Sequence, residues 1–95
     1  MRESEFRSFL EERYTDNAVN TRVSKGNAVE ELLGKSLDTI VSKDETMYKA
    51  LVDLEQYDNP KNNPRQNALR KYYEFANGRE FPRKKDYELA HNIHR

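Results

Sequence analysis

Four basic residues lie around the start of one predicted helix, and their types and spacing point most directly to a chemistry. They are Lys61, Arg65, Arg70 and Lys71. Asparagine and glutamine residues interleave with them between positions 62 and 67. Guanidinium, ammonium and amide groups bind phosphates and base edges, and the backbone amides at a helix N-terminus add phosphate donors. The pattern indicates nucleic-acid binding. The same residue types also occur at exposed helix starts that bind no partner.

Catalytic and metal-binding patterns are missing from the sequence. Pairs of adjacent glutamates occur at positions 11–12 and 30–31, but neighbours on a helix point about 100° apart and do not share a substrate. His91 and His94 have a spacing that suits a helical metal site, yet the sequence has no third histidine and no cysteine to complete it. No glycine-rich phosphate loop or nucleophile motif occurs. We therefore expect no enzyme activity, no metal and no cofactor.

The charges are unevenly distributed along a chain of 95 residues, a length that suits one small domain. Residues 1–60 hold 8 basic and 13 acidic residues, whereas residues 61–95 hold 9 basic and 4 acidic residues, so the formal net charge is zero. This polarity either joins the two halves of the domain or presents a basic face to an anionic partner. The absence of cysteine and of a long apolar run favours a cytoplasmic protein without membrane contact.

Residues 67–76 form the predicted central helix, because their apolar side chains make one continuous arc at the helical period. Asn67, Arg70, Lys71 and Glu74 form the opposite, outward face. A second long helix is expected over residues 17–33, with valines on its inner side. Its outer face carries short polar side chains between residues 20 and 31, and this face is either merely exposed or a contact surface.

Shorter elements complete the predicted fold. Residues 3–14 read as an amphipathic helix, residues 36–41 as a short turn started by Ser36, and residues 43–56 as a further helix. Ser42 and Glu45 match a capping box at the start of that helix. Prolines and asparagines between residues 58 and 65 predict a loop, and Gly78 is the expected end of the central helix. Residues 79–95 contain three consecutive basic residues at 83–85 and are expected to be a basic tail or linker, with a helical pattern after residue 86.

Two segments resemble motifs of the N-terminal core-binding domain of tyrosine recombinases, the SAM-like helical module of phage integrases. Residues 15–24, Thr-Asp-Asn-Ala-Val-Asn-Thr-Arg-Val-Ser, are similar to the pattern S-x-N-T-x-x-x-Y that opens the long second helix of that module. Residues 67–75, Asn-Ala-Leu-Arg-Lys-Tyr-Tyr-Glu-Phe, are similar to the pattern A-L-R-x-F-Y-x-F of its final helix. The likeness covers roughly residues 4–78.

In that family the module clamps duplex DNA with its second and last helices. The resemblance therefore implies that eight residues face DNA: Thr21, Arg22, Ser24, Lys25, Arg65, Gln66, Arg70 and Lys71. The second helix is less basic here than in the family, and the family's catalytic domain with its tyrosine nucleophile is not part of this sequence. The chain is then a stand-alone relative, an excised N-terminal piece, or a protein that kept the fold and changed its partner.

We predict an all-α domain over residues 1–78, built as a four-helix SAM-like bundle with one short extra helical turn and followed by the basic tail. The predicted function is non-catalytic binding of duplex DNA, mainly through phosphates, by the eight residues above together with Lys61. The alternative is a small protein-interaction module, such as a phage or mobile-element adaptor. Convergence of the basic residues with the polar face of the second helix would favour DNA, whereas the zero net charge favours the adaptor. The oligomeric state stays open.

Overall fold

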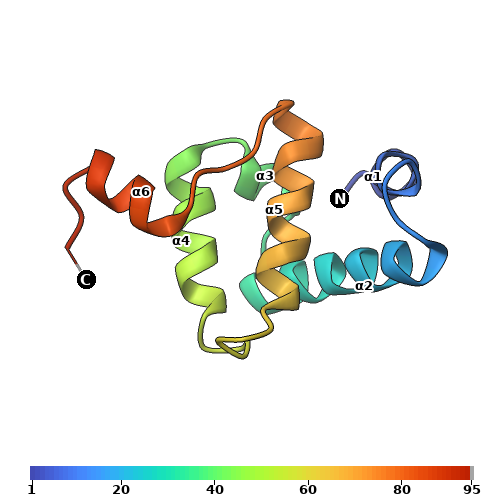
Figure 1. Cartoon of the computed structure of the whole chain (residues 1–95), viewed down its shortest axis with the longest axis horizontal. Helices are drawn as coiled ribbons and strands as arrows, with labels where there is room; N and C mark the ends of the chain where they lie inside the picture. The colour runs from blue at the N-terminus through green and yellow to red at the C-terminus, as the bar shows by residue number, and fades with distance from the viewer. Residues whose placement is uncertain (95) are drawn as a thin grey trace.

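Helix α5 (Pro64–Asn77) occupies the middle of the protein and packs against α1, α2, α3 and α4 (Figure 1). The computed structural model describes residues 1–94, and this part of the chain contains six helices. The other five are α1 (Glu3–Glu11), α2 (Asp16–Leu33), α3 (Leu37–Val41), α4 (Asp44–Leu54) and α6 (Lys84–Ala90). The described residues form no β-strand, so the predicted all-α class is confirmed. None of the helices within residues 1–94 has the length and apolar character needed to cross a membrane.

The apolar arc of α5 faces the core, as its spacing predicts. Ala68, Leu69, Tyr72 and Tyr73 are fully buried. The ring of Phe6 from α1 meets the Tyr72 ring edge-on, with 4.9 Å between the ring centroids. Aromatic side chains bury large apolar areas and prefer this edge-to-face arrangement, so the contact anchors α1 on α5.

Both ends of α5 are closed by residues close to them in sequence. At the start, the Asp58 carboxylate accepts hydrogen bonds from the backbone N–H groups of Arg65 (3.4 Å) and Gln66 (3.0 Å), which have no partner within the helix. At the end, Gly78 adopts a left-handed conformation (φ 72°), and its N–H donates to the carbonyl of Glu74. The predicted glycine stop is therefore confirmed.

The two serine caps predicted before α3 and α4 have different outcomes. Ser36 caps α3 as predicted, because its hydroxyl accepts the backbone N–H of Thr39 at 3.2 Å. The capping box at Ser42 is wrong. Ser42 is the C-terminal cap of α3, and its hydroxyl donates to the Thr39 carbonyl at 2.6 Å. The serine hydroxyl thus donates to a carbonyl in the last turn of α3. Helix α4 begins at Asp44 without a side-chain cap.

The segment expected to be a tail or linker contributes to the core. Phe81 and Tyr87 are only 5% and 6% exposed and belong to the same apolar cluster as the tyrosines of α5. The Tyr87 ring stacks on that of Tyr48 in α4, with 4.7 Å between the centroids, and Lys84 donates to Glu55 at 2.7 Å. These contacts hold α6 against α4, so the packing has no boundary at residue 78.

The hydroxyl groups of the two α5 tyrosines donate hydrogen bonds to carboxylates in the first turns of α3 and α4. Tyr72 donates to Asp38 (2.6 Å), and Tyr73 donates to Asp44 (2.5 Å). Burial, reinforced by the Asp44 hydrogen bond, raises the pKa of Tyr73 to about 12. Burial opposes ionisation of Asp38, but hydrogen bonds from Tyr72 and Arg2 outweigh it and lower the pKa of that carboxyl. These two hydrogen bonds fix α5 to the start of α3 and the start of α4.

Replacing Tyr72 with alanine should lower the free energy of unfolding by about 3 to 5 kcal/mol, because the change removes a fully buried ring. Replacing Glu74, on the outward face of the same helix, should cost less than about 0.5 kcal/mol. Urea denaturation followed by circular dichroism measures both values. Equal effects would mean that α5 turns a different face to the core.

The raised pKa of Tyr73 predicts a loss of stability at alkaline pH. Below pH of about 10 the hydroxyl is protonated in the folded and the unfolded chain, whereas between about 10 and 12 only the unfolded chain ionises, so stability should fall as the pH rises. Tyr73→Phe should remove this part of the decline, which denaturant unfolding across that pH range measures. Tyr57→Phe is the control, since Tyr57 is 46% exposed. The same change in both variants would contradict the prediction.

Candidate nucleic-acid interface

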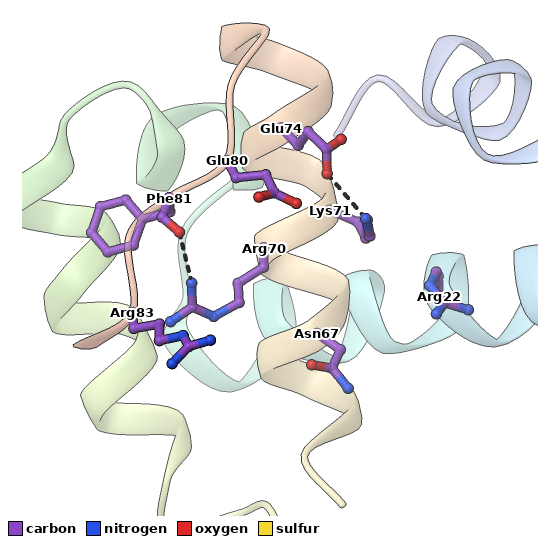
Figure 2. Close-up of a pocket in the computed structure, with 8 residues that line it drawn as sticks. All are labelled: Arg22, Asn67, Arg70, Lys71, Glu74, Glu80, Phe81 and Arg83. Atoms are coloured by element: carbon purple, nitrogen blue, oxygen red, sulfur yellow. Dashed lines mark hydrogen bonds and ion pairs between the residues drawn. The ribbon is translucent and has the colours of Figure 1, made fainter. Parts of the chain in front are cut away.

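A groove in which basic side chains outnumber acidic ones crosses the outward face of α5. It consists of a hollow of about 540 Å³ and an adjoining one of about 170 Å³, and we call the two together the basic groove. Its walls come from α2, the loop before α5, α5 itself and the segment after α5, most of which Figure 2 shows. Five basic and two acidic side chains give the lining a net formal charge of +3. The lining residues are Thr21, Arg22, Lys25, Asn62, Pro64, Asn67, Arg70, Lys71, Glu74, Glu80, Phe81 and Arg83.

Helix α2 places Arg22 and Lys25 three residues apart on the edge of the helix that borders α5. The buried side chains of Val19 and Val23 fix this orientation. The Arg22 guanidinium lies 3.9 Å from the centroid of the Tyr14 ring, and its buried Nε has no hydrogen-bond partner in the described structure. Neither Arg22 nor Lys25 has a carboxylate within 4 Å among residues 1–94. Neither charge is therefore balanced by a carboxylate of the described residues, although Arg22 also donates to the Ala18 carbonyl at 3.4 Å.

Arg70 joins the groove to the fold. Its guanidinium donates to the backbone carbonyls of Phe81 and Pro82, each at 3.1 Å, and so holds the segment after α5 in place (Figure 2). Burial lowers the pKa of Arg70, and the nearby Glu80 carboxylate raises it in part. An arginine remains charged in spite of such a shift. Arg70 therefore adds positive potential to the groove while it also supports one wall.

Lys71 is paired within the chain. Its ammonium lies 3.0 Å from the Glu74 carboxylate and 5.8 Å from the centroid of the Tyr14 ring. Burial lowers the pKa of Lys71, but Glu74 and the Tyr14 hydroxyl raise it by more, so its pKa lies above the usual value. Lys71 is thus a fully charged group that already has an anionic partner.

The segment between α5 and α6 brings Arg83 to the groove. Phe81 is buried with its ring edge-on to Tyr73, at 5.1 Å between the centroids, and this contact fixes the backbone two residues before Arg83. In Figure 2, Arg70 and Arg83 lie on one side of α5, and Lys71 and Arg22 lie on the other. No carboxylate of residues 1–94 lies within 4 Å of the Arg83 guanidinium.

The structure brings together five of the nine residues predicted to bind DNA, whereas Ser24 and Lys61 are exposed outside the groove lining. The polar face of α2 is divided, because Thr21 joins the groove while Asn20 accepts a hydrogen bond from Arg7 of α1 at 2.8 Å. The basic residues therefore converge with only part of that face. The five that line the groove are Thr21, Arg22, Lys25, Arg70 and Lys71.

Arg65 and Gln66, which were also predicted to bind DNA, do not line the groove, because their side chains are engaged within the fold. Gln66 is only 4% exposed and accepts a hydrogen bond from the Lys84 ammonium at 2.6 Å. The Arg65 guanidinium donates to the buried Asp58 carboxylate at 3.2 Å. The start of α5 and the docking of α6 use these polar groups, which a surface reading of the sequence does not reveal.

Glu80, Phe81 and Arg83 belong to the groove, although the sequence pattern does not single them out. Three consecutive basic residues at 83–85 are typical of a solvated linker. Because of that interpretation, Arg83 was not among the residues predicted to bind DNA. The available signal was the aromatic residue directly before the run. A phenylalanine at that place tends to be buried, and its burial fixes the position of the residues that follow it.

The groups that line the groove belong to types that bind anions in proteins. Guanidinium and ammonium groups bind phosphate or carboxylate, and the side-chain amides of Asn62 and Asn67 add neutral donors. Within the described residues, no cluster of three or more histidine, cysteine, aspartate or glutamate side chains could hold a metal ion. Comparisons with protein-family models, curated proteins and solved structures found no match for this chain.

Replacing Arg70 with alanine should lower the free energy of unfolding by about 1 to 3 kcal/mol, because two carbonyls lose a charged hydrogen-bond donor. The same denaturation experiment on Lys61→Ala, an exposed residue outside the groove, should show less than about 0.5 kcal/mol. Hydrogen exchange at the amides of residues 79–81 and 83 should become faster only in the Arg70 variant. Unchanged exchange there would show that the guanidinium does not hold this segment.

Proposed function

We propose that this protein is a non-catalytic DNA-binding domain of the integrase core-binding type, which contacts duplex DNA mainly through phosphates. The observation that carries the proposal is the meeting of basic side chains from α2, α5 and the segment after α5 in one groove. Gathering five cations on one face raises the local positive potential, which is unfavourable in the free protein and is relieved when an anion binds. Helices α2 and α5 also carry the two segments that resemble the DNA-facing helices of the core-binding module.

The groove chemistry fits a phosphate backbone better than it fits the reading of bases. Arg22, Lys25 and Arg83 offer charged donors, and Asn62 and Asn67 offer neutral ones. Most protein–DNA hydrogen bonds go to phosphate and sugar oxygens, and such contacts position a protein without reading sequence. Since the whole chain has no net charge, we expect weak binding, with a dissociation constant of about 10⁻⁶ to 10⁻⁴ M at physiological salt.

A protein-interaction module is the second candidate, and the two carboxylates in the groove favour it. Glu74 and Glu80 place negative charge among the cations. A surface of mixed sign is complementary to another protein surface of mixed sign, whereas it partly repels a polymer of phosphates. The partner in this case would be a protein docked on α2 and α5 through alternating charges, as an adaptor of a phage or mobile element would do.

Salt dependence separates the two candidates. Each neutralised phosphate releases about 0.9 counterion, so the affinity for a labelled duplex should fall steeply with salt, and Lys25→Ala or Arg83→Ala should each reduce the slope of log affinity against log salt by about one. Fluorescence anisotropy at several salt concentrations measures these slopes. The effect should hardly depend on the sequence of the duplex.

Lys35→Ala is the matched control for both variants. Lys35 is exposed, lies outside the basic groove and, within residues 1–94, has no carboxylate within 4 Å. This variant removes the same charge and should leave the slope unchanged. If the wild-type protein binds no duplex at low salt, or if all three variants behave alike, the DNA proposal fails and the interaction module takes its place.

A further inference from the structure

Glu74 forms an ion pair with Lys71, one of the cations that the basic groove would offer to a phosphate. Its carboxylate lies 3.0 Å from the Lys71 ammonium, and the two side chains are only 21% and 25% exposed. A partly sheltered pair is screened by salt less than a fully exposed one. In the free protein the positive charge of Lys71 is therefore balanced by the Glu74 carboxylate.

The cations of the groove are of two kinds. Lys71 is paired with Glu74, and the charge of Arg70 is opposed by the nearby Glu80 carboxylate. The remaining three have no carboxylate within 4 Å among the described residues, and they are Arg22, Lys25 and Arg83. We call these three the open cations, because no carboxylate of the described residues competes with an incoming anion for them.

We infer that Glu74 is a competitor for phosphate built into the groove, and that Lys71 consequently binds a phosphate of a phosphodiester polymer and not a free phosphate ion. The inference rests on the proposed function and specifies which form of phosphate the site takes. A duplex bound at the open cations presents its next phosphate to Lys71 at a high effective concentration, because the second contact is intramolecular. A free phosphate ion has no such tether and competes with Glu74 from bulk solution.

Binding at Lys71 is an exchange of ion pairs. The ammonium leaves the Glu74 carboxylate and donates to a phosphate oxygen, and the released carboxylate stays beside the bound phosphate. The Glu74 carboxylate and the bound phosphate are both negative and repel each other, so the exchange lowers the net affinity for DNA. Removing the charge of Glu74 while keeping its shape should therefore strengthen duplex binding.

Glu74→Gln is the test, with the labelled-duplex titration at several salt concentrations. Lys71 then gains a phosphate without losing a partner, so the slope of log affinity against log salt should steepen by about one, and the affinity at about 0.1 M salt should rise about five- to tenfold. Glu45→Gln is the matched control, because Glu45 is an exposed residue of α4 outside the groove and the change in net charge is the same. It should change the affinity less than about twofold, since distant exposed charges are screened.

Two further measurements connect the gain to Lys71 and to the polymer. Lys71→Ala introduced together with Glu74→Gln should cancel the increase, because the two side chains act as a pair. Inorganic phosphate added at constant ionic strength competes at the open cations whether or not Lys71 is present, so it should weaken duplex binding by the same factor in the wild-type protein and in Lys71→Ala.

The possible failures are distinguishable. If the wild-type protein binds duplex through Lys25 but Glu74→Gln binds with the same or a lower affinity, the competitor inference fails and the proposed function stands. If inorganic phosphate weakens duplex binding more in the wild-type protein than in Lys71→Ala, a free phosphate ion reaches Lys71 and the selection of a polymer is wrong. If neither the wild-type protein nor Glu74→Gln binds duplex at low salt, the proposed function and this inference fail together.

Discussion

The burial of two adjacent tyrosines on α5 is the constraint on which the rest of the structure depends. Neighbouring residues of a helix point about 100° apart, so Tyr72 and Tyr73 are buried together only if other elements surround most of α5. Their hydroxyls also need partners, because a buried polar group without a hydrogen bond is costly. Asp38 and Asp44 supply these partners, one at the start of α3 and one at the start of α4. The position of α5 therefore determines where the neighbouring helices begin.

The same constraint makes the groove. Because the core takes up most of the circumference of α5, only a narrow strip remains outside, and Asn67, Arg70, Lys71 and Glu74 fill it. The segment after α5 lies on one side of this strip. Helix α2 crosses behind α5 and brings Arg22 to the other side (Figure 2). Arg70 serves both parts, since it lines the groove and also holds the carbonyl of Phe81. The charge of the groove and the packing of the fold are thus coupled through single side chains.

Local signals in the sequence predicted their structures, and signals that depend on distant residues did not. Gly78 ends α5 and Ser36 caps α3 because each acts on its own helix end. Ser42 stands between two helices, and its pattern alone does not tell which helix receives the hydroxyl. The burial of Gln66 depends on Lys84, which lies 18 residues further along the chain. The helical periods, which gave the all-α class and the outward strip of α5, contain no information of this kind, so the basic groove was predicted only in part.

The opposite charges of the two chain halves pair with one another and also leave a basic groove at the surface. Carboxylates of residues 1–60 pair with Arg65, Arg79 and Lys84 of the second half, and these ion pairs hold the halves together. Three of the cations that this pairing leaves over, Arg70, Lys71 and Arg83, lie in the basic groove with Arg22 and Lys25 of α2. The lining has a net formal charge of +3 although the chain has none. At physiological salt a charge acts over roughly 8 Å, so an approaching anion responds to the lining and hardly to carboxylates elsewhere on the surface. A net charge of zero is therefore compatible with a site for anions, and under the proposed function the local balance between the open cations and Glu74 sets the affinity of that site.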